Sequence, residues 1–307
     1  MDDPRELPDG RLVCGPHGRV HCFVCCVDYS FMDDIIEGED DDSFGCEAEA
    51  TDSHPAAGLV DHKRLRRGTG QAFPTKFVPP SATITPLELF SGRRSHMFVT
   101  RQVIVHSRCK MVQAFANIGN LSRYTLRNDA GKALIRTDGA CLDNGQQNPK
   151  AGWAFWHGLG PSGQLLVASG RLEKKGPFGD ESSQTSNRAE LRAVIAALRF
   201  RFWPGEGFHT LVVATDSEFV VEGSTAWART WVAHRWVKRE GGGVKNKDLW
   251  PREALLGEVE QLKDSGTAVE FWKIPREWNI VADAAAKEAA AEEEAPSEWQ
   301  EYFGINI

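Results

Sequence analysis

The sequence ALIRTDGAC at residues 133–141 begins as a short apolar run and continues into an Asp-Gly pair. The apolar run predicts a buried strand over 133–137, and Asp138-Gly139 predicts the point where that strand ends. Two more strands are predicted at 151–157 and 165–172, because both stretches are apolar and the glycines between them favour a turn. The three strands together indicate an antiparallel meander.

After this meander, helical and extended patterns alternate. Leu191, Val194, Ile195 and Leu198 repeat at helical spacing, which predicts a helix over 187–200. The other predicted elements are a strand at 211–214, a helix from 218, a helix at 247–263 that includes Pro251, a strand at 269–274 and a helix at 279–294. This order predicts an α/β fold with a five-stranded mixed sheet, three antiparallel strands and then parallel strands, flanked by helices.

The chain divides into four regions, and the last has the most regular pattern. They are a Cys/His segment at 9–30, an acidic and then basic linker at 31–75, an extension of unknown role at 76–131 and the α/β domain at 132–295. The composition of the linker predicts disorder. We expect the extension to be partly ordered, with a short helix at 86–91 and a strand at 97–105, and to serve in docking.

Charge is distributed unevenly along the chain. Residues 1–60 contain 15 Asp and Glu and 3 Arg, which gives −12; since the whole chain carries −7, the remaining residues carry +5. A mildly basic body is compatible with phosphate binding. The start, MDDPRE, resembles neither a signal peptide nor a transit peptide, and no apolar run is long enough to cross a membrane. We therefore expect an intracellular protein of the nucleus or cytoplasm, neither secreted nor membrane-bound.

Four acidic residues occupy similar places in these elements. Asp138 ends the first strand, Glu190 lies in the first turn of the first helix, Asp216 ends the fourth strand and Asp283 lies in the first turns of the last helix. Carboxylate oxygens suit Mg2+, and clustered acids are costly without a cation because like charges raise one another's pKa. A single Asp after a strand is usually a turn residue or a helix cap, so spacing alone leaves that alternative open.

Several motifs surround these acids in a fixed order. They are TDGAC at 137–141, TSNRAEL at 185–191, TDS at 215–217, the tryptophans 227, 231 and 236, VKNKDLW at 244–250, and Asn279 before Asp283. The set resembles the type 1 ribonuclease H family, in particular its RNase H-domain proteins of filamentous-fungal type. The resemblance covers residues 133–290, about half of the chain.

This resemblance implies an RNase H-like fold and an endoribonuclease that hydrolyses the RNA strand of RNA–DNA hybrids by two-metal-ion catalysis. The catalytic carboxylates would hold two Mg2+ ions, with Mn2+ as the alternative, and would be Asp138, Glu190, Asp216 and Asp283. The residues implied to bind substrate are Gly139, Cys141, Thr185, Asn187, Phe219, Trp227, Trp231, Trp236 and Asn246. Among them, Asn187 and the backbone of 139–141 would contact the RNA 2′-hydroxyls.

The other strand of the hybrid would be held by aromatic and basic groups. Phe219 and Trp227 match channel positions for the DNA strand, and Thr185 with Asn246 matches a DNA-phosphate pocket. Residues 231–239 would form a basic protrusion that meets phosphates. A Trp in such a cluster is as often part of a core as of a channel, so both roles stay open.

The chain departs from the family at two positions. The family has a His in the loop before the fourth acid, whereas this chain has no His after His234; Glu277 is our candidate for that role. Ser183 stands where the family has a phosphate-pocket Arg. These departures predict weaker hybrid binding and a slower reaction. Because the acids that carry most of the electrostatic stabilisation are retained, we still expect activity.

The amino-terminal segment contains four soft or borderline ligands at tight spacing, namely Cys14, His17, Cys22 and Cys25. Such a set suits a structural Zn2+ ion, which would supply most of the folding energy of so short a segment. A reduced Cys-rich loop without metal is the alternative. The acidic surroundings of this Cys/His segment favour a protein partner over nucleic acid.

Two alternatives to the nuclease remain at this level. One is a catalytically weak or inactive hybrid-binding protein, and the other is a zinc-dependent adaptor in which the RNase H-like domain is a scaffold. The four acids argue against a pure binding protein, because nothing would then require such repulsive charges to stay together. Nothing in the sequence indicates an oligomer, and we expect a monomer.

Overall fold

The computed structural model describes residues 72–94, 98–106, 112–119, 121–237, 242–251 and 254–306, with short segments at 5–7, 12–13, 21–22 and 27–28. The short segments form two strand pairs, β1 (Arg5–Glu6) with β2 (Leu12–Val13) and β3 (His21–Cys22) with β4 (Val27–Asp28). Of the predicted zinc ligands, Cys14, His17 and Cys25 lie outside the described residues, and only the backbone of Cys22 is described. Residues 31–71 of the predicted linker also lie outside them.

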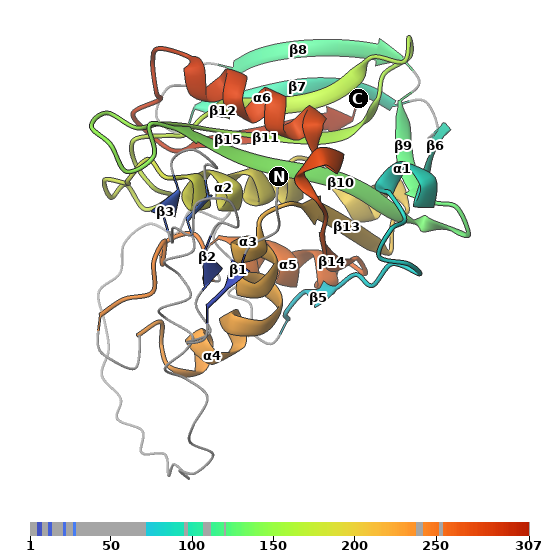
Figure 1. Cartoon of the computed structure of the whole chain (residues 1–307). Helices are drawn as coiled ribbons and strands as arrows, with labels where there is room; N and C mark the ends of the chain where they lie inside the picture. The colour runs from blue at the N-terminus through green and yellow to red at the C-terminus, as the bar shows by residue number, and fades with distance from the viewer. Residues whose placement is uncertain are drawn as a thin grey trace, which may run out of the picture.

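An eight-stranded mixed sheet forms the centre of the protein (Figure 1). Its strands are β12 (Leu165–Arg171), β11 (Lys150–Leu159), β9 (Ser122–Leu126), β10 (Asp129–Leu142), β13 (Thr210–Thr215), β14 (Ala268–Lys273), β5 (Thr75–Lys76) and β6 (Phe90–Arg94). Strands β10, β11 and β12 pair antiparallel, and β10, β13 and β14 pair parallel. The predicted mixed sheet is therefore confirmed, and β5, β6 and β9 extend it beyond five strands.

Strand β10 is longer than its apolar run predicts. It covers 14 residues, and Asp138 lies inside it, opposite Ala154 of β11. The predicted strand end at Asp138-Gly139 is wrong, because antiparallel pairing with β11 continues to Leu142 opposite Lys150. The glycine serves close packing: a Cβ on Gly139 would lie 2.1 Å from the backbone nitrogen of Glu190. Gly139 therefore lets a helix lie directly against β10.

Two helices cover opposite faces of the antiparallel strands, and Figure 1 shows the strands between them. Helix α2 (Ser186–Arg199) packs on the large aliphatic and aromatic side chains of one face. Helix α6 (Ile280–Ala291) packs on Ala140 and Ala154 of the other face. Successive side chains of a strand point to opposite faces, so α2 and α6 approach the same strands from two sides. The helices predicted at 187–200 and 279–294 are confirmed within a few residues.

The region after β13 contains shorter helical elements than predicted. They are α3 (Glu218–Glu222), a π-helical turn η3 (Gly223–Trp227), α4 (Ala228–Ala233) and α5 (Leu255–Asp264). The helix predicted at 247–263 is wrong in its first part, because α5 begins only at Leu255 and the residues before Pro251 form turns. Proline lacks an N–H and clashes with the preceding turn, so the helix starts after it. No helix in the described ranges is long and apolar enough to span a membrane.

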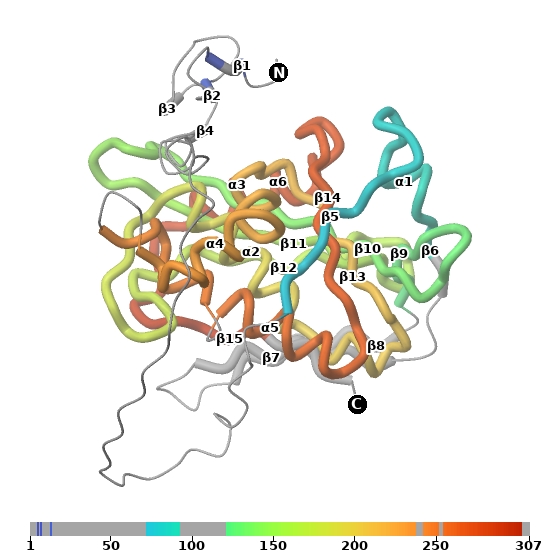
Figure 2. The backbone as a smooth tube through the Cα atoms, turned by 90° about the horizontal axis from the view of Figure 1, so that it is seen from below, coloured from blue at the N-terminus to red at the C-terminus, as the bar shows by residue number. Residues whose placement is uncertain are grey.

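The extension before β10 is built into the fold. Strand β5 lies parallel to β14 at the sheet edge (Figure 2), and Phe77 packs on Trp272 with ring centroids 5.1 Å apart. Helix α1 (Pro86–Leu89) is confirmed and is followed by β6, which pairs with β9. The strand predicted at 97–105 is β7 (Phe98–His106); it pairs with β8 (Val112–Gly119) and with the carboxy-terminal β15 (Gln300–Asn306).

A buried ion pair joins the carboxy-terminal segment to the domain. Arg192 of α2 donates to Glu173 Oε1 at 2.8 Å, and both side chains are at most 2% exposed. The same guanidinium donates to the carbonyl of Gln300 at 2.7 Å and stacks over Trp299 at 4.0 Å. Because each charge is withdrawn from water, loss of either partner would leave the other uncompensated.

We predict that Arg192→Met lowers the free energy of unfolding by about 3–5 kcal/mol, because Glu173 then stays buried without a cation. The control is Lys175→Met, which removes the partly exposed pair with Glu298 and should cost about 0–1 kcal/mol. Urea unfolding followed by tryptophan fluorescence measures both. Similar losses in the two variants would contradict a special role for the buried pair.

Candidate active site

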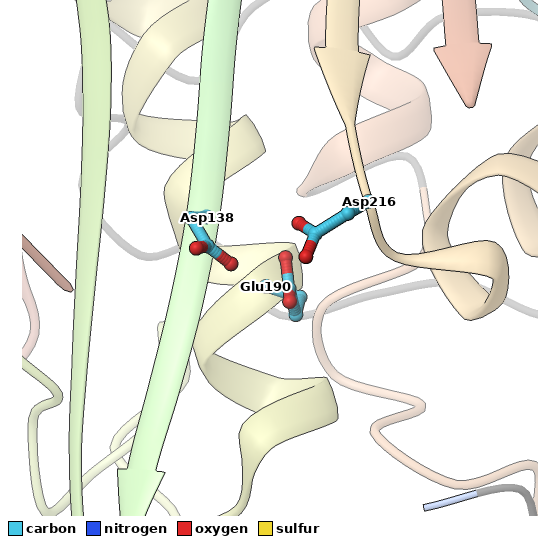
Figure 3. A group of neighbouring side chains, drawn as sticks. All are labelled: Asp138, Glu190 and Asp216. Atoms are coloured by element: carbon cyan, nitrogen blue, oxygen red, sulfur yellow. The ribbon is translucent and has the colours of Figure 1, made fainter. Parts of the chain in front are cut away.

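Three carboxylates from different elements meet at one end of the parallel strands. Asp138 comes from β10, Glu190 from α2 and Asp216 directly follows β13 (Figure 3). One carboxylate oxygen of each lies within 4.8 Å of those of the other two. The predicted convergence is therefore observed for these three acids.

The strand topology explains this meeting point. The parallel pairing of β10 with β13 ends at Arg136 opposite Ala214, and the two strands separate beyond it. Asp138 and Asp216 follow that last pair by two residues each, so their side chains lie on either side of the opening. Ligand sites of α/β sheets form where neighbouring strands part in this way.

Glu190 reaches the site from α2. It is the fifth residue of the helix, so the predicted position in its first turn is wrong by one residue. Thr185 caps this helix by accepting a hydrogen bond from the Arg188 amide at 3.3 Å, which fixes where the helix begins. The close contact at Gly139 then sets Glu190 beside Asp138.

The fourth acid, Asp283, lies outside this group of three. It is in the first turn of α6 as predicted, but both of its oxygens accept from cationic side chains. Arg276 Nη2 donates to Oδ1 at 2.7 Å, and Lys287 Nζ donates to Oδ2 at 2.8 Å. Arg276 also lies near Asp216, with its Nε 3.8 Å from Oδ2. A guanidinium therefore stands between the fourth acid and the other three.

Burial and like charge act together on the clustered acids. Burial raises the pKa of Asp138 well above its ordinary value, and the charges of Asp216 and Asp283 raise it further. Burial also raises the pKa of Glu190, and Asp138 and Asp216 add to the effect. For Asp283 burial acts in the same direction, but the hydrogen bonds from Lys287 and Arg276 outweigh it and lower the pKa. Ionising Asp138 and Glu190 together is thus costly without an added cation.

The donor set fits a hard divalent cation. Asp138 Oδ1 accepts from the Gly139 amide at 2.8 Å, but Glu190 Oε2 is buried and has no hydrogen-bond partner among the described residues. A buried acceptor without a partner requires an explanation, and a metal ion supplies one. Oxygen ligands of this kind are those that Mg2+, Mn2+ and Ca2+ take in proteins.

Asn279, the residue directly before α6, supports the site. Its side chain is fully buried, and Nδ2 donates to Asp216 Oδ1 at 3.0 Å and to the Thr137 carbonyl at 2.9 Å. The second bond occupies a backbone acceptor of β10 just beyond its last pair with β13. Asn279 therefore fixes the orientation of Asp216 and ties α6 to β10.

Two residues of this site, Arg276 and Lys287, were not predicted from the sequence. Glu277, the candidate considered for the loop before Asp283, is exposed, and Arg276 is the residue that reaches the acids. Lys287 could have been found, because a Lys four residues after an Asp on a helix is a favourable pair. Arg276 could not, because its direction depends on the 3-10 turn η4 (Arg276–Trp278).

Three of the residues predicted to bind substrate lie in two segments, Thr185 and Asn187 at the start of α2 and Asn246 in the loop at 244–250. Asn187 and Asn246 are both half-buried, and Asn246 has a left-handed φ of 54°. The two segments are joined by Arg188, which donates to Asp248 from Nη1 at 2.8 Å and Nη2 at 2.5 Å. The positions predicted for the RNA and DNA strands are thus held in fixed relation by a two-bond ion pair.

The predicted aromatic positions divide between core and surface. Phe219 is 4% exposed and packs edge-on against the buried Trp250 at 5.3 Å. Trp227, Trp231 and Trp236 are half-buried and pack in series, with ring centroids 5.8 and 6.2 Å apart. The tryptophans therefore keep some surface for a ligand, whereas Phe219 mainly fills the core.

Cys141 is buried, with its Sγ 3.5 Å from the Gln184 carbonyl, so its side chain faces the protein interior. Lys238 and Arg239 of the predicted basic protrusion lie outside the described residues.

Comparison with known proteins places this site in a family. The family model for RNase H matches residues 131–291. Ribonuclease H of Neorickettsia sennetsu is 39% identical over 119 residues, which is 39% of this chain and 68% of that protein. Ribonuclease H of Polaromonas naphthalenivorans is 40% identical over 124 residues, covering 40% of this chain and 66% of that protein.

A solved structure, LC9-RNase H1, described as a type 1 RNase H with the type 2 active-site motif, is 28% identical. The match covers 52% of this chain and 72% of that chain with a TM-score of 0.34. The family assignment rests on the family model and the sequence relatives. The matched region is more than half of the chain and contains all four acids. The chain therefore belongs to the RNase H family, which confirms the predicted family and the predicted enzyme class of ribonuclease.

Proposed function

We propose that this ribonuclease is an endonuclease that hydrolyses the RNA strand of RNA–DNA hybrids with the help of two divalent metal ions. The observation that carries the proposal is the group of Asp138, Glu190 and Asp216, whose oxygens lie within 4.8 Å of one another in a mostly buried position. Full ionisation of such a group requires a cation nearby. Mg2+ is the proposed ion, with Mn2+ as the alternative.

The four acids would hold the ions, and the ions would supply charge stabilisation for the attacking and leaving oxygens of a phosphodiester. Asp138 and Glu190 are fixed by the contact between β10 and α2. Asp216 is oriented by Asn279, and Asp283 joins the other acids across Arg276.

Selection of the RNA strand would depend on the start of α2. Asn187 and the backbone at 139–141 would contact 2′-hydroxyl groups, which distinguish RNA from DNA. Thr185, Asn246 and the half-buried tryptophans would contact the DNA strand. The Arg188–Asp248 pair supports this arrangement because it sets the spacing of the two halves.

The other expectations stay predictions. They are the Zn2+ ion of the amino-terminal segment, a protein partner for that segment, a monomeric state and an intracellular location in the nucleus or cytoplasm.

The first test is cleavage of a labelled RNA–DNA duplex. Wild-type protein should cut the RNA strand only when Mg2+ or Mn2+ is present, and Asp138→Asn should reduce the rate by at least about 1,000-fold because one oxygen ligand loses its charge. An all-DNA duplex of the same base sequence is the control. Binding of the hybrid without cleavage by wild type would favour the hybrid-binding alternative, and absence of both would favour the adaptor.

A second prediction concerns Asn279. Asn279→Ala removes the donor to Asp216 and should lower activity by about 10- to 100-fold and raise the Mg2+ concentration needed for half-maximal rate, because supporting hydrogen bonds orient metal ligands. Steady-state cleavage at several Mg2+ concentrations measures this, with urea unfolding alongside. An unchanged Mg2+ dependence, with a loss explained by unfolded protein, would mean that Asn279 is only structural.

A third prediction concerns pH in metal-free buffer. Folding raises the pKa of Asp138 and Glu190, so their stabilising contribution is complete below the unfolded-state pKa of about 4 and is lost as pH rises through the higher folded-state pKa. Asp138→Asn with Glu190→Gln removes this loss. The unfolding free energy of the double variant minus that of wild type should therefore increase from about pH 4 to about pH 8 with EDTA present.

Urea unfolding at several pH values gives that difference directly. Acids outside the cluster titrate alike in both proteins, so their contributions cancel in the subtraction. A difference that does not change with pH would show that folding does not raise the pKa of these two buried carboxyls.

A further inference from the structure

Arg276 has an unusual position for a cationic side chain. It projects from η4 into the group of acids, where it donates to Asp283 Oδ1 at 2.7 Å and lies 3.8 Å from Asp216 Oδ2. Its side chain is 26% exposed, so the guanidinium lies at the boundary between the site and solvent. Although burial opposes its charge, the hydrogen bond to Asp283 and the charge of Asp216 raise its pKa.

Asp283 is fully engaged in this arrangement. Its second oxygen accepts from Lys287 at 2.8 Å, so each oxygen of the carboxylate already has a cationic partner. A metal ion bound between Asp283 and the group of three acids would lie next to the guanidinium, and two positive charges at such a distance repel each other. Arg276 and that ion therefore compete for the same carboxylates.

The backbone of the loop is anchored, so the side chain is the part that can move. Arg136 donates to the Trp278 carbonyl at 2.9 Å, and Asn279 holds the Thr137 carbonyl at 2.9 Å. About a quarter of the Arg276 side chain faces solvent, so a path outward from the acids is open to the guanidinium. Rotation about its side-chain bonds would take the charge outward while the loop stays in place.

We propose that Arg276 is an internal counter-ion that bridges Asp216 and Asp283 in the metal-free protein and must leave this position before a divalent ion binds between Asp283 and the group of three acids. The proposal rests on the metal site of the proposed function. It assigns Arg276 a role in the metal dependence of the protein: the residue stabilises the metal-free fold and weakens binding of one ion.

The test compares Arg276→Gln with Lys287→Gln. Both variants lose one positive charge and one hydrogen bond to Asp283, at 2.7 and 2.8 Å respectively, but only Arg276 also pairs with Asp216. Thermal unfolding is recorded during titration with Mg2+, and binding of Mn2+ is measured by electron paramagnetic resonance. Neither readout requires cleavage.

For Arg276→Gln we expect a lower melting temperature in EDTA and a roughly tenfold lower Mn2+ dissociation constant, because the competing charge is gone. For Lys287→Gln we expect a shift of less than about threefold, since its ammonium interacts with one carboxylate at the surface. Equal shifts in the two variants would overturn the proposal in favour of general electrostatics. Weaker or unchanged Mn2+ binding by Arg276→Gln would also overturn it.

A second variant covers the case in which Arg276→Gln does not fold. Arg276→Lys keeps the charge but lacks the planar fork that lets one side chain pair with both carboxylates, so its Mn2+ affinity should exceed that of wild type by less than about tenfold. No Mn2+ binding by wild type or either variant overturns the proposal. If the variants bind Mn2+ as expected while wild type leaves RNA–DNA hybrids uncut, the proposed function fails and the role of Arg276 stands.

Discussion

The close contact between β10 and α2 at Gly139 is the constraint on which the candidate site depends. Any side chain at this position would overlap the backbone of Glu190, so the helix can lie this near the strand only because position 139 has no Cβ. The contact brings a carboxylate from a strand next to one from a helix, and both are withdrawn from water. The resulting repulsion is a consequence of the fold itself and creates the need for a cation.

The opposite face of the sheet uses the same device with small residues. A Cβ on Gly152 of β11 would lie 2.3 Å from the backbone nitrogen of Ala290, and alanines of α6 pack on Ala140 and Ala154. This approach brings the first turn of α6 to the point where β10 and β13 separate. Asn279 can then reach both Thr137 and Asp216, which links the two faces of the sheet through one buried amide.

The sequence was sufficient to predict most of the domain and all three acids of the observed cluster, whereas the fourth predicted acid, Asp283, lies outside it. The order of strands and helices follows from hydrophobic periodicity, and the motifs locate Asp138, Glu190 and Asp216 because each stands at a fixed place relative to an element. Periodicity does not reveal that Asp138 lies inside a strand, since pairing with β11 overrides the turn preference of Asp-Gly. The strands β5, β6 and β9 were also missed, because short strands are specified by tertiary pairing more than by local pattern.

Arg276 illustrates the other limit of sequence analysis. The loop 275–279 contains one acid and one base in succession, and composition alone does not tell which of them faces the metal site. The 3-10 turn decides this, together with two hydrogen bonds that anchor it. They run from Arg136 to the Trp278 carbonyl and from Asn279 to the Thr137 carbonyl, and both join the loop to the distant strand β10. The consequence is physical: a site that needs added cations for its chemistry already contains one of its own. The energy that stabilises the metal-free protein is therefore subtracted from metal binding, so stability and metal affinity cannot both be maximal at this position.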